Sequence, residues 1–173
     1  MSDFGGDGEL VEVHLRGFPV VVHRRASEHQ QELQREFQLI LIGAADGPID
    51  VPKRLFELID VVTTRFAGVS DPQTREIEEA DLKGVETIDD LIYRVPPATS
   101  AACVALSRML DECDDYCREG GALLTLSSPD EALAYRRWYL GEFVAQLGGH
   151  RPLAWPDADH RALLATPELR GET

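Results

Sequence analysis

The 173-residue sequence predicts a single α/β domain, with a small mixed or parallel sheet of about three strands and about five helices. Polar and apolar residues alternate strictly over residues 9–16, which is typical of a half-buried strand. After Pro19, apolar residues recur every three or four positions, which is typical of an amphipathic helix. Residues 122–126 are almost all apolar and follow a Gly-Gly pair, which indicates a strand covered on both faces.

Three helices are expected after the first strand. One covers residues 19–42 and ends at a segment rich in glycine and proline. The next covers residues 50–67, with Asp50 as its N-cap and Gly68 as its C-terminal cap. The third covers about residues 70–82, and its small apolar surface predicts that it is mostly solvated.

The second half of the chain is expected to supply a βαβ unit. A strand at 88–95 should end at Pro96-Pro97, because proline cannot donate to a sheet. A helix at 97–118 then leads to the strand at 122–126, so these two strands should be parallel. With one more helix at the end, the predicted element order is β-α-α-α-β-α-β-α.

The last predicted helix and the two chain ends set the domain boundaries. Ser128 and Glu131 have the spacing of a capping box, so this helix should begin there and continue to about residue 147. Residues 1–8 are expected to be disordered, and residues 9–149 to form one domain. Residues 150–173 should form a tail that docks partly on the domain.

Composition narrows the class of function. The net charge of −14 argues against nucleic acid as a partner, because binding phosphates requires a basic surface. No apolar run approaches the roughly 18 residues of a membrane span, and the N-terminus lacks a secretory pattern, so a cytoplasmic protein without a membrane partner is expected. The usual motifs for phosphate loops, dinucleotides, zinc proteases and serine hydrolases are absent from the sequence, which assigns no catalytic residue, cofactor or metal.

The three cysteines are expected in the core. Cys113 and Cys117 continue the apolar stripe of the helix at 97–118, where a free cysteine behaves as a small hydrophobic residue. An odd number of cysteines, with Cys103 as the third, also argues against a disulfide framework. Metal or redox chemistry is the alternative.

The histidines also have two interpretations. His29 lies on the apolar stripe of the first helix, so it is expected to be a core-edge residue with a hydrogen-bond partner. The alternative makes His29 a general base or a ligand-binding residue. His14 and His23 lie on polar faces and should face water.

Acidic residues concentrate in two segments. Residues 71–90 carry a net charge of −6, and residues 111–119 carry −4. The second segment lies in the last turns of a helix, where the helix dipole disfavours each acid by about 0.3–1 kcal/mol. Three interpretations remain open: a solvated surface, a docking surface for a basic protein partner, or a divalent cation site.

The run Arg136-Arg137-Trp138 is a further candidate contact. Trp138 lies about 100° around the last helix from its buried stripe, and arginine and tryptophan frequently anchor protein interfaces. Alternatively, Trp138 packs under the tail against Leu153 or Trp155. The candidate partner-binding residues are therefore Asp111, Glu112, Asp114, Asp115, Arg136, Arg137 and Trp138.

Parts of the pattern resemble the GHKL-type ATP-binding fold of small bacterial anti-sigma-factor kinases. The similar segments are residues 11–16, the helix after Pro19, Asp50-Val51 with the helix that follows, residues 106–111 and residues 120–126. In that family, the second helix carries Glu-x-x-x-Asn, whose asparagine holds magnesium. Glu57 matches the glutamate, but Val61 stands at the asparagine position, and the Asp-x-Gly-x-Gly element is missing. Asp60 is one residue away from the asparagine position, so its side chain points about 100° away from that position around the helix.

The resemblance implies a scaffold that has lost its nucleotide site and kept a binding role. The leading hypothesis is therefore a non-catalytic regulatory adaptor of bacterial signalling, active in sigma-factor regulation, whose acids at 76–90 and 111–119 steer a basic protein partner. The alternative is a divergent nucleotide-binding protein or kinase of the GHKL type. A third hypothesis is an enzyme with a pocket around His29; His29, Glu57 and Asp60 are the candidates for a ligand or polar core site.

Overall fold

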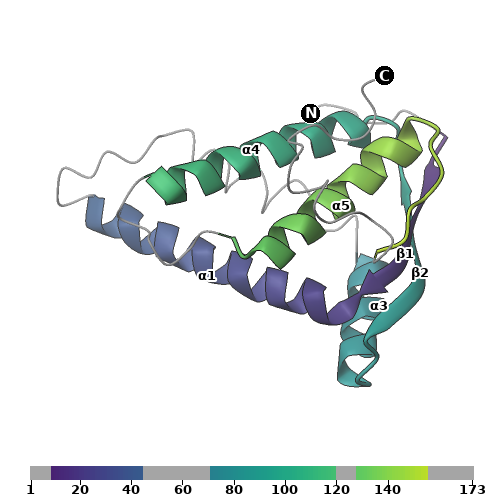
Figure 1. The fold of residues 1–173 in the computed structure, drawn as a ribbon, viewed down its shortest axis with the longest axis horizontal. Coiled ribbons are helices and arrows are strands. Elements are labelled where there is room, and N and C mark those ends of the chain that lie inside the picture. Colours follow the sequence, from purple (N-terminus) through teal and green to yellow (C-terminus); the bar gives the residue numbers. More distant parts are fainter. Residues whose placement is uncertain (1–8, 45–70, 120–127, 156–173) are drawn as a thin grey trace, which may run out of the picture.

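The computed structural model describes residues 9–44, 71–119 and 128–155. These residues form an α/β structure whose elements are β1 (Val11–Pro19), α1 (Val20–Ala44), α3 (Asp71–Leu82), β2 (Thr87–Val95), α4 (Thr99–Glu119) and α5 (Asp130–Leu147). The predicted helix at 50–67, the predicted strand at 122–126 and the two chain ends at 1–8 and 156–173 lie outside the described residues. Figure 1 shows α5 between α1 and α4, with the strands at one end of these helices and α3 beside β2.

The two described strands form an antiparallel pair. Val11 lies opposite Val95 and Pro19 lies opposite Thr87. The wholly parallel option for the sheet is therefore wrong. The reason is the return path of the chain: the N–H of Val20, just after β1, donates to the carbonyl of Glu86, just before β2, at 3.0 Å. Because β2 begins where β1 ends, it must run back along β1.

The inner face of the sheet packs on α5 and forms the core. Val13 and Leu15 are buried on β1 while Glu12 and Arg16 are exposed, so the predicted alternation is confirmed. On β2 the buried residues follow the same alternation: Leu91, Tyr93 and Val95. Helix α5 contacts α1, α4 and β1, and it is consequently buried on more than one face.

Aromatic rings fill the space between α5, the sheet and the tail. The Tyr135 ring lies 6.1 Å from Phe18 and 6.0 Å from Trp155, measured between ring centroids. Trp138 and Trp155 lie 5.4 Å apart with their planes inclined at 62°. Such tilted and edge-to-face pairs stabilise a core by about 0.5–1.5 kcal/mol each beyond the burial of apolar area.

The start of α5 and the ends of α3 and α5 show how these helices are capped. Helix α5 begins at Asp130 without a side-chain cap, so the predicted capping box at Ser128 is wrong. The Ser128 hydroxyl instead donates to Asp114 Oδ1 at 2.7 Å. Gly84 after α3 and Gly149 after α5 have positive φ values of 70° and 88°, and the hydrogen bonds around them are those of a Schellman motif.

Candidate functional site

The acidic end of α4 is paired with α5. One terminal nitrogen of Arg136, Nη2, lies 2.7 Å from Asp111 Oδ1 and 2.7 Å from Asp114 Oδ2. The Arg136 side chain is 16% exposed and that of Asp114 only 5%. The cation from α5 therefore offsets the unfavourable position of these acids at the C-terminal end of α4, a contact that the sequence alone did not indicate.

This pairing corrects the predicted partner surface. Arg137 Nη2 also approaches Asp111, at 3.7 Å, so the two arginines and two aspartates form a cluster with no net charge. The expectation that Asp111 and Asp114 present a free acidic surface is therefore wrong. Glu112 and Asp115 are exposed, and Asp115 pairs with Arg118 on the same helix at 3.1 Å.

Trp138 is fully buried, with 0% of its surface exposed. Its indole nitrogen donates to the carbonyl of Leu153 at 3.0 Å, and its ring packs on Trp155. Of the two interpretations of Trp138, the one that places it under the tail is confirmed. Its side chain is covered in this structure and does not form part of the surface.

Residues 150–155 cross α5 and cover the edge of β1 that faces away from β2. We call this segment the strap. The Leu153 N–H donates to the buried carboxylate of Glu142 at 3.0 Å, and the Trp155 N–H donates to the carbonyl of Arg16 at 3.0 Å. The Gln146 side chain completes the cover, because its amide bonds both the N–H and the carbonyl of His14, each at 2.8 Å. Residues 150–155 thus contact the domain, and the rest of the predicted tail lies outside the described residues.

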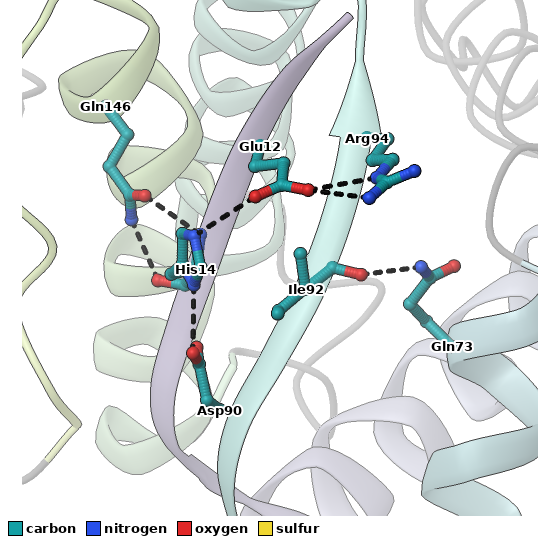
Figure 2. A network of polar contacts seen from close by, with 7 residues as sticks. All are labelled: Glu12, His14, Gln73, Asp90, Ile92, Arg94 and Gln146. Carbon is teal, nitrogen blue, oxygen red and sulfur yellow. Dashed lines mark hydrogen bonds and ion pairs between the residues drawn. The ribbon is translucent and has the colours of Figure 1, made fainter.

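The solvent face of the sheet carries a row of ionic contacts, which Figure 2 shows. Arg94 on β2 binds Glu12 on β1 at 2.8 Å, and the His14 ring lies 2.9 Å from Asp90. His14 is thus half-buried among carboxylates and does not simply face water. These cross-strand pairs fix the register on the polar face of the sheet.

Among the described residues, the outer edge of β2 is open apart from one side-chain contact, in contrast to that of β1. Since the backbone of His14 bonds to Gln146 and faces away from β2, its antiparallel partner Ile92 must also face away from β1. The carbonyl of Ile92 accepts from the Gln73 side chain at 2.6 Å (Figure 2). Within residues 9–44, 71–119 and 128–155, no other hydrogen bond reaches this edge at Asp90, Ile92 or Arg94.

Acidic and apolar side chains are exposed on β2 and on α3, which contacts it. Four exposed acids on α3, the following turn and β2 have no ion pair with any residue in the described ranges: Glu76, Glu78, Glu86 and Asp89. Three large apolar side chains are also exposed on the same elements: Leu82 (88%), Val85 (41%) and Ile92 (39%). We call these seven residues, with the outer edge of β2, the α3–β2 surface.

A cavity of about 270 Å³ lies between α1, α4 and α5. His29 lines it, together with His23, Ser27, Tyr135 and Arg136. His29 Nε2 is buried and has no hydrogen-bond partner in the described chain, which differs from the expected satisfied core-edge histidine.

His23 is the more strongly held of the two histidines, contrary to the expectation that it faces water. Its Nδ1 lies 2.7 Å from the Tyr135 hydroxyl, and its Nε2 lies 3.5 Å from Ser27 Oγ. Burial lowers the pKa of His23 below its ordinary value, with Asp81 opposing this effect, so the ring is uncharged at neutral pH. No local sequence pattern signals the contact between His23 and Tyr135, because the two residues are 112 positions apart.

The remaining predictions fall partly outside the described ranges. Glu57 and Asp60 lie there, so nucleotide binding stays a prediction, which a rise in melting temperature with Mg-ATP would support. Cys103 is buried, as expected, while the side chains of Cys113 and Cys117 are not among those described. The described residues contain no group of three or more metal-ligating side chains and no helix long and apolar enough to cross a membrane.

Comparison with protein-family models, with curated proteins and with solved structures finds no significant match to this chain.

Proposed function

We propose that this protein is a non-catalytic regulatory adaptor that binds a basic protein partner through the α3–β2 surface. The observation that carries the proposal is the open edge of β2, which lies among exposed acids and exposed apolar side chains. An unpaired strand edge offers its N–H and carbonyl groups to a strand from another chain. Natural proteins usually protect such an edge, and this chain does protect the corresponding edge of β1.

The partner segment that fits this edge is extended and basic. Strand addition supplies affinity through main-chain hydrogen bonds, and alternate side chains of the added strand supply specificity. Lysine or arginine side chains on that strand would meet Glu86 and Asp89, which have no ion pair within the described ranges. Apolar side chains would meet Ile92 and Val85.

Charge gives this binding mode a kinetic signature. Complementary charges mainly raise the association rate, and salt screens them over about 10 Å at 0.1 M ionic strength. Binding should therefore slow as the salt concentration rises. The resemblance to anti-sigma-factor kinases makes a sigma factor or one of its protein regulators the first partner to test.

The test is affinity capture from a lysate of the organism that encodes the protein, at low and high salt, with four forms of the chain in parallel. The forms are the wild type, Ile92→Pro, the double variant Glu86→Lys/Asp89→Lys, and the control Glu32→Lys. Ile92→Pro removes an N–H that faces away from β1, so it blocks the outer edge and spares the β1–β2 pairing. Glu32 is exposed on α1, which makes its charge reversal a control for net charge alone.

We expect the wild type and Glu32→Lys to retain the same protein at low salt, and both β2 variants to lose it. With the purified partner, the double variant should associate at least roughly tenfold more slowly at low salt. Equal retention by all four forms would show that the partner binds elsewhere. A column on which the wild type retains no protein would also contradict the proposal.

A further inference from the structure

The cavity between α1, α4 and α5 has the size of a site for a small molecule. An engineered cavity of about 150 Å³ in another protein is large enough to bind benzene. The volume of about 270 Å³ therefore suits one aromatic ring with a substituent of a few atoms. This cavity contains no residue of the α3–β2 surface, so its role is independent of the proposed partner binding.

The walls of the cavity are mainly apolar. Two tyrosine rings of α5, those of Tyr135 and Tyr139, form part of the lining. Five aliphatic side chains from all three helices also line it: Ala26, Leu106, Leu110, Ala132 and Leu140. The polar residues of the lining include His29, Gln30 and Ser128 besides those discussed below. A flat apolar molecule would gain burial and ring contacts on these walls.

His23 and Ser27 provide a polar group at one side of the cavity. They lie one turn apart on α1, and both line the cavity. Their separation of 3.5 Å between Nε2 and Oγ is long for a hydrogen bond, so each retains capacity to bond a ligand. The other ring nitrogen of His23 is fixed by Tyr135 at 2.7 Å, which holds the imidazole in place.

The lining has no unbalanced charge. Arg136 is the cation of the lining, and it is already paired with Asp111 and Asp114. The imidazole of His23 is uncharged at neutral pH. None of the described residues that line the cavity carries a carboxylate that would attract a cation. An ionised ligand would lose part of its hydration without gaining a partner charge, so the cavity favours an uncharged one.

We infer that this cavity binds a small uncharged aromatic molecule, with the ring between Tyr135 and the leucines of α4 and with one hydrogen-bonding substituent at His23 and Ser27. The ligand class is that of substituted benzenes with a hydroxyl or amide group.

The test uses three probes of similar shape, benzamide, benzoate and benzylammonium, with the full-length protein. Saturation-transfer NMR and titration of the protein's amide signals measure binding. We expect benzamide to bind at least tenfold more tightly than either ion. Ala132→Leu and Ala26→Leu place a larger side chain in the cavity and should each abolish benzamide binding, whereas Ala105→Leu, on an exposed position of α4, should leave it unchanged.

Two results would overturn the inference. One is absence of benzamide binding to the wild type at millimolar concentration. The other is binding that persists in both cavity-filling variants while their circular dichroism and melting curves match the wild type. If one of these variants does not fold, the other decides. Ser27→Ala should weaken benzamide binding severalfold without changing the preference for the uncharged probe. This result would place the amide group of benzamide at Ser27.

Discussion

The indole nitrogen of Trp138 donates to the carbonyl oxygen of Leu153 across a distance of 3.0 Å. This bond fastens the strap at 150–155 to α5, and the Trp155 ring packs on the Trp138 ring, 5.4 Å away between centroids. The indole is fully buried, so this bond is the contact that satisfies its N–H.

Trp138→Phe should therefore destabilise the protein by about 1–3 kcal/mol through the unpaired Leu153 carbonyl, in addition to the lost ring volume. Urea unfolding followed by circular dichroism measures this change. Leu153→Ala is the control, because it keeps the carbonyl and removes a side chain that is 40% exposed. Equal destabilisation by both variants would mean that the hydrogen bond contributes little.

Arg136→Met should destabilise the fold by about 3–5 kcal/mol, because it leaves two carboxylates facing each other, one of them buried. The matched control is Arg118→Met, which breaks an exposed pair with Asp115 and should cost less than about 1 kcal/mol. The free energies of unfolding of the two variants give the comparison. Similar losses in the free energy of unfolding would show that the contacts of Arg136 with Asp111 and Asp114 stabilise the fold no more than an exposed ion pair does.

The stability of the protein should depend on pH through His23. Burial lowers the pKa of His23 in the folded state, so the unfolded chain binds the proton more readily. Stability is then fully present above the ordinary value of 6.5 and decreases as the pH falls below it toward the folded-state pKa. His23→Gln should reduce this slope between pH 7 and 5. Unfolding in urea at a series of pH values measures the slopes of the wild type and the variant, and an unchanged slope in His23→Gln would refute the assignment.

Cys103 should resist alkylation in the folded protein. Burial raises the pKa of its thiol to about 11, and only 3% of the residue is exposed. Peptide mapping after iodoacetamide treatment at pH 8 should find Cys103 unmodified until urea is added. In a variant carrying Ala105→Cys, an exposed position on the same helix, the new thiol should react without urea. Rapid labelling of Cys103 in the native state would contradict its burial.

Local sequence patterns predicted the positions of the helices and strands better than the contacts between them. The alternation at 11–16 and the helical periods of α1, α4 and α5 reflect which side of each element faces the core, and this information is contained in neighbouring residues. The antiparallel direction of β2 depends on how α3 returns the chain to the end of β1, which no local pattern contains.

The candidate site shows the same limit. The acids at 111 and 114 were evident, but their arginine partner lies 22–25 positions away on another helix. The contact between His23 and Tyr135 joins residues even farther apart. The sequence thus shows which charged side chains are present. Whether the acids are exposed or form an internal ion pair depends on how α4 packs on α5, and the sequence alone does not show this.

The unequal edges of the two-stranded sheet have a consequence for self-association. A filament grows by strand pairing only if each molecule has two free edges, one to receive a neighbour and one to pass the pairing on. Gln146 and Trp155 occupy the edge of β1, whereas within the described ranges the edge of β2 carries only the Gln73 side chain. A second copy that added a strand at β2 would therefore find no matching edge on β1, so strand pairing of this kind could not continue beyond two chains.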